Sequence, residues 1–160
     1  MHTAARQWVQ AHLPAKAGDV LEIGSRNING GVRDLFADAK SFLGVDLVDG
    51  TDVDVVGDFA TLDMVGVADT VLCLEVLEHV ELWRDLLGAC IDACRPGGTI
   101  IITAAGPTRE PHSAIDGGRL RPDEYYENLT TKALKKELAS LDPLLINELG
   151  GDVRAVGVRP

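Results

Sequence analysis

The chain has 160 residues, enough for one compact domain that buries about two thirds of its unfolded surface. Its net charge of −10 repels phosphate backbones and disfavours nucleic acid as a substrate. No apolar run reaches the roughly 18 residues of a membrane span, and Met1 to Gln10 lacks the pattern of a signal peptide, so we predict a cytoplasmic protein.

The N-terminal segment carries apolar residues at close to helical spacing from Thr3 to Leu13 and stops at Pro14. We therefore predict an N-terminal helix within residues 1–14. It is expected to cover the ligand side of the sheet, although a helix that only packs against the core fits the same pattern.

A buried strand and a glycine loop follow in the stretch VLEIGSRNINGGVR, from Val20 to Arg33. The apolar residues suit a buried parallel strand, and Gly24 allows both a sharp turn and the close approach of a ligand. A helix predicted from about Val32 to Ala37 would direct backbone N–H groups and the positive end of its dipole into the turn. The pattern predicts a site for a nucleotide-like ligand.

The next predicted strand, Ser41 to Asp46, ends in an acid 22 residues after Gly24. An acid about 20 residues beyond a glycine turn, at the tip of the neighbouring strand, is placed to accept both hydroxyls of a ribose. Asp46 is therefore a candidate ribose ligand. A free ribose diol suits NAD or an adenosyl cofactor and argues against a 2′-phosphate.

The core continues as an alternation of strand and helix. Strands are predicted at 53–56, 69–74 and 99–104, with a helix at 80–94 and the turn Arg95-Pro96-Gly97-Gly98 before the last strand. The cysteines, Cys73, Cys90 and Cys94, fall in these apolar elements. We assign them to core packing and predict no metal site.

Five short motifs, in this order and spacing, resemble the class I S-adenosylmethionine-dependent methyltransferases. They are Glu22-Ile23-Gly24, Val45-Asp46, Val56-Gly57-Asp58-Phe59, LEVLEHV at 74–80 and RPGGT at 95–99. The resemblance covers roughly Asp19 to Ala105, and its most specific part is EVLEHV followed 15 residues later by RPGG. Arg26 and Ile28 stand where the family usually has its second and third glycines, and we expect Gly30 and Gly31 to take over the close approach.

The resemblance implies S-adenosylmethionine as the cofactor and S-adenosylhomocysteine as its product. It implies that Asp58 accepts a hydrogen bond from the adenine amine and that Phe59 lies against the ring, although Asp58 could instead cap the following turn. Backbone carbonyls after the fourth strand are expected to hold the cofactor's ammonium group, while Glu75 or His79 faces the acceptor. The implied cofactor-binding residues are Glu22, Gly24, Ser25, Arg26, Asn29, Gly30, Asp46, Leu47, Asp58, Phe59, Glu75 and Val76.

Residues 106–128 show no periodicity, and a long irregular segment of this kind is usually a functional lid or a disordered stretch. Many small-molecule members of the resembling family carry a histidine and then an aromatic pair at this point. His112 is the candidate general base here, since a free histidine titrates near pH 6.5. A catalytic role is also considered for His79.

The same segment supplies the candidate acceptor-binding residues. These are Tyr125, Tyr126 and Arg109. The arginines of the segment, Arg109, Arg119 and Arg121, could bind an anionic acceptor or could simply solvate the lid.

The C-terminal segment is predicted as a helix opened by Thr130 and Thr131 and running through Leu141, followed by an antiparallel hairpin of 144–149 and 152–158. The chain is thus predicted to be a single α/β domain with a Rossmann-like, doubly wound, seven-stranded sheet. The sheet is mostly parallel with an antiparallel C-terminal hairpin and has helices on both faces. The expected parts are the N-terminal helix (1–14), the cofactor-binding core (19–105), the substrate loop or lid (106–128) and the C-terminal helix and hairpin (129–160).

These inferences favour a methyltransferase that moves a methyl group, by in-line displacement, from a sulfonium to an oxygen or nitrogen of a small-molecule acceptor. Two other classes stay open. A cofactor-binding protein without catalysis could serve as a regulator or partner subunit. A nicotinamide-dependent oxidoreductase would share the glycine turn and the ribose acid, although Arg26 and Ile28 do not fit its usual Gly-x-Gly-x-x-Gly pattern. The sequence assigns no oligomeric state.

Overall fold

The computed structural model describes residues 3–160, so the first two positions of the predicted N-terminal helix lie outside the described residues. Within this range seven strands form one sheet in the order β3-β2-β1-β4-β5-β7-β6. The strands are β1 (Asp19–Ile23), β2 (Ser41–Asp46), β3 (Val55–Val56), β4 (Ala68–Leu74), β5 (Cys94–Ala105), β6 (Leu144–Leu149) and β7 (Asp152–Val158). Strands β1 to β5 pair in parallel, and β7 runs antiparallel to both β5 and β6. The predicted mixed sheet with its C-terminal hairpin is confirmed.

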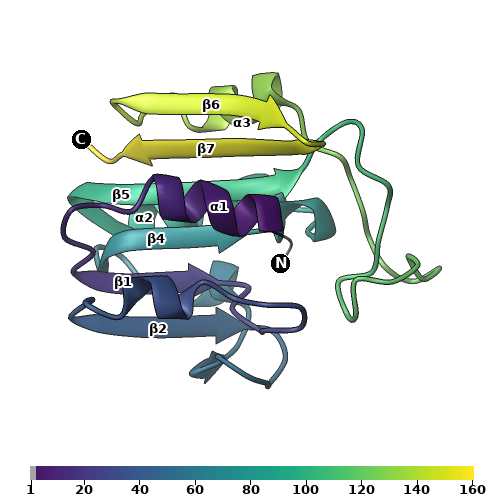
Figure 1. Cartoon of the computed structure of the whole chain (residues 1–160), viewed down its shortest axis with the longest axis horizontal. Coiled ribbons are helices and arrows are strands. Elements are labelled where there is room, and N and C mark those ends of the chain that lie inside the picture. The colour runs from purple at the N-terminus through teal and green to yellow at the C-terminus, as the bar shows by residue number, and fades with distance from the viewer. Residues whose placement is uncertain (1–2) are drawn as a thin grey trace.

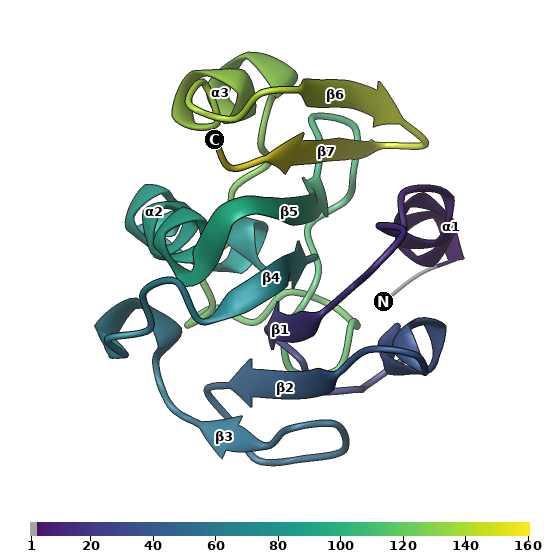
Figure 2. The same ribbon diagram turned by 90° about the vertical axis from the view of Figure 1, so that its left-hand side faces the viewer.

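Helices lie on both faces of the sheet, as Figure 2 shows. On one face lie α1 (Thr3–Ala11) and the 3₁₀ turn η1 (Arg33–Phe36), and on the other lie α2 (Trp83–Ala93) and α3 (Thr131–Glu137). Two further 3₁₀ turns, η2 (Phe59–Thr61) and η3 (Leu77–His79), belong to the connecting loops. None of the helices in residues 3–160 has the length and apolar character needed to cross a bilayer. The arrangement confirms the predicted doubly wound fold.

The centre of the sheet consists of β4 and β5, whose side chains are buried on both faces. Ile100 and Ile102 pack on the α2 side, whereas Ile101 and Leu72 pack on the α1 side, and all four are 0% exposed. Continuous apolar runs are what a strand covered by helices on both sides requires. The three cysteines are buried free thiols, in agreement with their assignment to the core.

Helix α1 is the predicted N-terminal helix, and it packs Trp8 and Val9 into the core on its face of the sheet. None of its residues lines the cavity described below. Its link to the ligand side runs through Arg6, which donates to the carbonyl oxygen of Gly31 at 2.6 Å and pairs with Asp34 at 2.6 Å. The helix therefore supports the end of the glycine loop from behind rather than covering the ligand side.

The element after the glycine loop differs from its prediction. In place of a helix over 32–37 there is only η1, a 3₁₀ turn of four residues whose N-cap residue, Val32, makes no side-chain cap. So short a turn has no appreciable helix dipole. The expected helix N-terminus pointing into the glycine loop is therefore absent from the described chain, and the prediction was wrong at this point.

Other predicted elements differ in their bounds. The helix expected over 80–94 begins only at Trp83, after η3, and α3 ends at Glu137 instead of Leu141. The stretch 95–98, predicted as a turn between helix and strand, is an irregularity inside β5: Cys94 pairs with Ala68, and the register then shifts before Thr99 pairs with Thr70. The third strand is shortened to two residues, because only Val55 and Val56 pair with β2.

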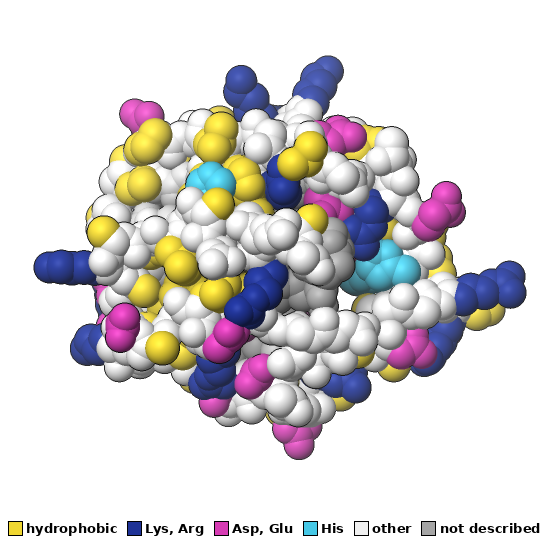
Figure 3. Space-filling model, viewed as in Figure 1, with side chains coloured by type: hydrophobic (Ala, Val, Ile, Leu, Met, Phe, Trp, Pro, Cys, Tyr) yellow, Lys and Arg dark blue, Asp and Glu magenta, His cyan; other side chains and the backbone are white. Residues whose placement is uncertain are grey.

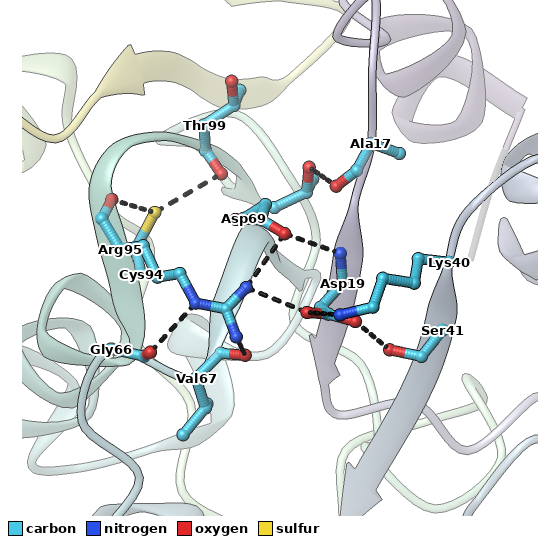
Figure 4. A network of polar contacts seen from close by, with 11 residues as sticks. Ala17, Asp19, Lys40, Ser41, Gly66, Val67, Asp69, Cys94, Arg95 and Thr99 are labelled. Atoms are coloured by element: carbon cyan, nitrogen blue, oxygen red, sulfur yellow. Dashed lines mark hydrogen bonds and ion pairs between the residues drawn. The ribbon is translucent and has the colours of Figure 1, made fainter.

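A polar cluster holds the amino ends of four parallel strands together (Figure 4). Nη1 of Arg95 on β5 lies 2.9 Å from the carboxylates of both Asp19 on β1 and Asp69 on β4. Lys40 and Ser41 donate to Asp19 at 3.0 and 2.8 Å and so include the start of β2. These hydrogen bonds hold the pKa of Asp19 well below its usual range. The cluster aligns the strands at the end opposite to the cavity.

We predict that Gly44→Ala lowers the free energy of unfolding by about 1–3 kcal/mol, because overpacking displaces backbone. The added Cβ would lie 2.2 Å from the carbonyl oxygen of Asp52 and 2.6 Å from Oγ of Ser25. Gly88→Ala on α2 is the matched control, since no atom lies within 4 Å of its added Cβ. That change should stabilise the protein by up to about 1 kcal/mol through helix propensity. Urea unfolding of both variants measures the difference, and equal stabilities would contradict the close packing at Gly44.

Candidate functional site

A cavity of about 1390 Å³ lies at the carboxyl ends of the parallel strands. The arrows of β1, β2, β4 and β5 point to this side of the molecule, from which the segment 106–128 projects (Figure 1). Figure 3 shows an opening on that side with histidine side chains at its edge. The loops after β1, β2, β3 and β4 line the cavity together with the 106–128 segment, which we call the lid. Open α/β sheets bind their ligands at this edge.

The loop after β1 turns sharply at Gly24, which has a φ of 73°. A Cβ on this residue would lie 2.1 Å from Cγ2 of Val76, so only glycine fits between the loops after β1 and β4. Gly24 and Ser25 both donate their backbone N–H to the carbonyl oxygen of Val45, at 2.8 and 3.2 Å. The hydroxyl oxygen of Ser25 is buried and has no hydrogen-bond partner among the described residues.

The far part of this loop contacts the lid. Gly30 has a φ of 102° and donates its N–H to Oδ1 of Asn27 at 2.9 Å. Nδ2 of Asn29 donates to the carbonyl oxygen of Asp116 on the lid at 3.4 Å. Asn29 and Gly30 therefore lie where the glycine loop and the lid meet over the cavity.

Asp46 ties the end of β2 to the glycine loop. Its Oδ2 accepts the backbone N–H of Arg26 at 3.0 Å, and its Oδ1 accepts that of Val48 at 3.0 Å. Each carboxylate oxygen can accept a further hydrogen bond, because it has two lone pairs. Leu47, 66% exposed, follows it on the cavity wall.

Glu22 is a buried carboxyl group on β1 that lines the cavity and is only 4% exposed. Burial raises its pKa to about 8, and the nearby carboxylate of Asp52 adds to the effect. A buried carboxylate is favoured when a positive charge lies beside it. Glu22 is therefore an uncharged carboxyl group at neutral pH that would ionise if a cation bound beside it at the base of the cavity.

Asp58 and Phe59 start the turn after β3. Oδ1 of Asp58 accepts the backbone N–H of Ala60 at 3.1 Å, so the capping role considered for it is present. Asp58 lines the cavity, and within residues 3–160 no hydrogen bond is made by its other carboxylate oxygen, Oδ2. Phe59 is 4% exposed and packs in the core on the α2 side, so only a small part of the side chain reaches the cavity.

Glu75 follows β4 in a strained conformation and is linked to the base of the lid. Its φ of 58° is uncommon for a residue other than glycine, and such strain is concentrated at functional sites. Nη1 of Arg109 lies 3.4 Å from Oε2 of Glu75 and also forms an ion pair with the buried Asp152 on β7. Arg109 lines the cavity, but its charge is already matched by two carboxylates.

Two histidines and a tyrosine form an aromatic cluster between η3 and the lid. The ring centroids lie 5.0 Å apart for His79 and His112, 5.3 Å for His79 and Tyr126, and 5.2 Å for His112 and Tyr126. Burial, together with the nearby His112, lowers the pKa of His79 to about 4, so this ring is neutral at neutral pH. Burial also raises the pKa of Tyr126 to about 12.

Glu78 is a residue of this region to which the sequence analysis gave no role. It lies in η3 beside His79 and is 0% exposed. Burial, and then the neighbouring Glu75, raises its pKa to about 8. The only available signal in the sequence was an acid inside the apolar stretch LEVLEHV, and it did not distinguish a buried carboxyl group from a solvated one.

Every site residue predicted from the sequence lines the cavity except Tyr126. The ring of Tyr126 packs against His79 and His112, which do line it. Tyr125 lines the cavity and donates its hydroxyl to Glu127 at 2.6 Å. Arg119 and Arg121 do not line it, and Arg121 pairs with Asp116 at 2.8 Å. Acidic residues outnumber basic ones among the described lining residues. The eight acids are Glu22, Asp46, Asp58, Glu75, Glu81, Asp85, Glu110 and Glu124, and the two arginines are Arg26 and Arg109.

Comparisons with known proteins identify the fold. No protein-family model and no curated protein sequence matches the chain. Among solved structures, it is similar to the 1,6-didemethyltoxoflavin-N1-methyltransferase of Burkholderia thailandensis with bound 1,6-didemethyltoxoflavin and S-adenosylhomocysteine, at 20% identity over 98% of this chain and 77% of that chain, with a TM-score of 0.72.

Two more solved structures agree. One is a chain of the complex between the Haloferax volcanii Trm112 methyltransferase activator and a proposed methyltransferase, at 17% identity over 99% of this chain and 90% of that chain, with a TM-score of 0.68. The other is human N-acetylserotonin methyltransferase in complex with S-adenosylmethionine, at 16% identity over 98% of this chain and 52% of that chain, with a TM-score of 0.67. The chain therefore has the fold of the class I S-adenosylmethionine-dependent methyltransferases, as its motifs indicated.

The raised pKa of Glu22 predicts how stability changes with pH. Below about pH 4.5 the group is protonated in both states, and as the pH rises toward its folded pKa of about 8 the folded state loses stability. We expect Glu22→Gln to remove this loss, so its stability relative to the unmodified protein should increase by about 1.4 kcal/mol per pH unit between pH 5 and 8.

Urea unfolding at several pH values measures this difference. Glu148→Gln, which removes a carboxylate from an exposed position of β6, is the matched control and should show no such trend. A constant difference between Glu22→Gln and the unmodified protein across this range would show that Glu22 is not a buried acid of raised pKa.

Proposed function

We propose that the protein is an S-adenosylmethionine-dependent methyltransferase that moves a methyl group to an oxygen or nitrogen of a small-molecule acceptor, with S-adenosylhomocysteine as its other product. It would act in the cytoplasm without a nucleic-acid substrate. The observation that carries the proposal is the charge of the cavity, which is lined in the described chain by eight acidic residues against two arginines; Glu22 is the one acid of these whose raised pKa of about 8 keeps it uncharged at neutral pH until a cation lies beside it.

The cavity charge favours a cationic cofactor over a dinucleotide. S-adenosylmethionine carries a sulfonium and an ammonium group against one carboxylate, so it is net positive, whereas NAD carries a doubly negative pyrophosphate. An acid-lined cleft attracts the first and repels the second. In addition, the four-residue turn η1 offers no α-helix N-terminus to a pyrophosphate. Both points argue against the nicotinamide-dependent alternative.

The adenosine half of the cofactor fits the polar groups along one side of the cavity. Asp46 would accept the ribose hydroxyls with the lone pairs that Arg26 and Val48 leave open. The uncapped oxygen of Asp58 would accept the adenine amine, with Leu47 against the ring. The buried, unpartnered hydroxyl of Ser25 offers a further hydrogen bond at the glycine loop.

The methionine half would lie toward Glu22 and Glu75. Glu22 is uncharged below its raised pKa, and a bound ammonium group would favour its ionised form. Gly24, packed against Val76, leaves room for the ligand between the loops after β1 and β4. The cavity of about 1390 Å³ exceeds the roughly 300–1,000 Å³ of a single small-molecule site, so cofactor and acceptor can lie side by side.

The acceptor side consists of the lid and the histidine cluster. The cofactor supplies an activated methyl group on sulfur, so the chain's own task is to align the acceptor atom in line with that bond and to exclude water. Tyr125, Leu82 and Ile115 are exposed apolar or aromatic residues of the cavity lining and give it apolar surface. A proton leaving the acceptor would pass to His112, which packs against the neutral ring of His79.

Calorimetric titration tests the cofactor assignment. We expect micromolar binding of S-adenosylmethionine and S-adenosylhomocysteine and no comparable binding of NAD. Asp46→Asn should weaken the adenosyl ligands by about 1–3 kcal/mol, the magnitude of a lost charged hydrogen bond. Asp49→Asn, which removes an equal charge from an exposed residue outside the cavity lining, should leave the affinity unchanged. Binding of NAD without an adenosyl ligand would overturn the assignment.

A further inference from the structure

Three potential metal ligands meet where η3 faces the lid. Glu78 and His79 are consecutive residues of η3, and His112 comes from the lid. Each offers one ligand atom, and these three atoms lie within 4.8 Å of one another. Two of the residues, His79 and His112, also line the cavity, so an ion held here would be accessible to an acceptor.

The buried polar atoms of this cluster lack partners. Both carboxylate oxygens of Glu78 are buried and make no hydrogen bond of normal geometry among the described residues, although the backbone N–H groups of Glu78 and Ala105 lie near them. Nδ1 of His79 is likewise buried and unpartnered in that part of the chain. Leaving such groups unsatisfied is costly, and a cation would satisfy both at once.

His112 has the hydrogen bond that metal-binding histidines usually have. Its Nδ1 lies 3.2 Å from the carbonyl oxygen of Glu110 and 3.3 Å from the hydroxyl of Tyr126. A histidine ligand commonly donates its other ring N–H to a carbonyl group, which fixes the tautomer and the ring orientation. With Nδ1–H directed at Glu110, Nε2 of His112 is left to bind an ion.

We propose that Glu78, His79 and His112 bind one divalent transition-metal ion, with Zn²⁺ the best match. Two imidazoles and one carboxylate form a donor set used by zinc and its neighbours in the first transition row. Metal–ligand distances of about 2.0–2.2 Å place tetrahedral ligands roughly 3.4 Å apart. Ligand atoms that lie up to 4.8 Å apart must therefore approach by up to about 1.4 Å. The His112 side chain would supply this movement by rotation, since its backbone is paired with Arg119 in an isolated β-bridge. The site departs from the sequence analysis, which predicted no metal.

The ion would give the acceptor side a Lewis acid. A hydroxyl of the acceptor could complete the coordination and would lose its proton at lower pH when bound to the ion. In this form His79 and His112 are both metal ligands, so the proton of the acceptor hydroxyl would pass to solvent water and the resulting alkoxide would attack the methyl group. This catalytic role rests on the proposed function, whereas metal binding itself does not.

The test uses the untagged, chelator-stripped full chain. Calorimetry measures the binding of Zn²⁺ in one titration, and visible absorption measures the binding of Co²⁺ in a second. We expect one equivalent of Zn²⁺ to bind with micromolar or tighter affinity. We also expect Co²⁺ to give the visible bands of a site with nitrogen and oxygen ligands. Both measurements need neither cofactor nor acceptor.

Variants assign the binding to the three residues. His112→Ala, on the lid, and Glu78→Gln, nearly isosteric, should each weaken Zn²⁺ binding at least about tenfold. His12→Ala is the matched control, because His12 lies outside the cavity, bonded to the carbonyl of Trp8 at 2.8 Å, and its loss should change nothing. Circular dichroism checks that Glu78→Gln is folded. If Glu78→Gln unfolds, the Zn²⁺ affinity of His112→Ala decides the test by itself. Equal Zn²⁺ affinity in His112→Ala and the unmodified chain would overturn the proposal.

The outcome separates this site from the proposed function. Zn²⁺ binding without binding of an adenosyl ligand would keep the metal site and contradict the methyltransferase assignment. Adenosyl binding with no Zn²⁺ or Co²⁺ binding would keep the assignment and overturn the metal site.

Discussion

Two glycines without room for a side chain determine how the loops over the sheet fit together. Gly24 lies against Val76, and Gly44 in β2 lies under Ser25 and the backbone of Asp52. The loops after β1, β2 and β4 can therefore overlap closely above neighbouring strands. That overlap lets Asp46 accept an N–H group of the glycine loop and encloses the side chain of Glu22. A methyl group at Gly24 would displace the side chain of Val76, and one at Gly44 would displace the backbone of Asp52 or the side chain of Ser25.

Because the loops pack closely over the sheet, they bury acidic side chains in places where loss of solvent disfavours the charged form. Glu22 and Glu78 both have pKa values raised to about 8, chiefly by burial, and this costs stability as the pH rises. Such costs are typical of functional sites, where a ligand rather than the folded chain satisfies the buried groups. Here two kinds of cation are proposed: the ammonium of a cofactor beside Glu22, and a metal ion beside Glu78. The acidic lining is also the reason why we expect this cavity to bind a cationic adenosyl cofactor in preference to a dinucleotide.

Local patterns predicted much of the fold. The bounds of β2 and of the hairpin β6–β7 agree with the prediction residue for residue, because apolar strands and the turn at Gly150 are marked in the sequence itself. The short length of η1 was not predicted, since no Gly or Pro marks its end in the sequence; its Phe36 shares a buried cluster with Trp8 of α1, a contact that only the fold reveals. The glycine loop and Asp46 were found by their spacing. Glu78 was missed because His112, which lies near it, comes from the lid, whose path no periodicity reveals.

The central claim is that the acid-lined cavity holds an adenosyl cofactor in one orientation, and a crystal structure of the complex with S-adenosylhomocysteine tests it most directly. The account predicts the ribose hydroxyls on Asp46, the adenine between Leu47 and Asp58, and the ammonium group toward Glu22 and Glu75. The ligand bound outside this cavity, or in it with the adenine toward the lid histidines, would contradict the account.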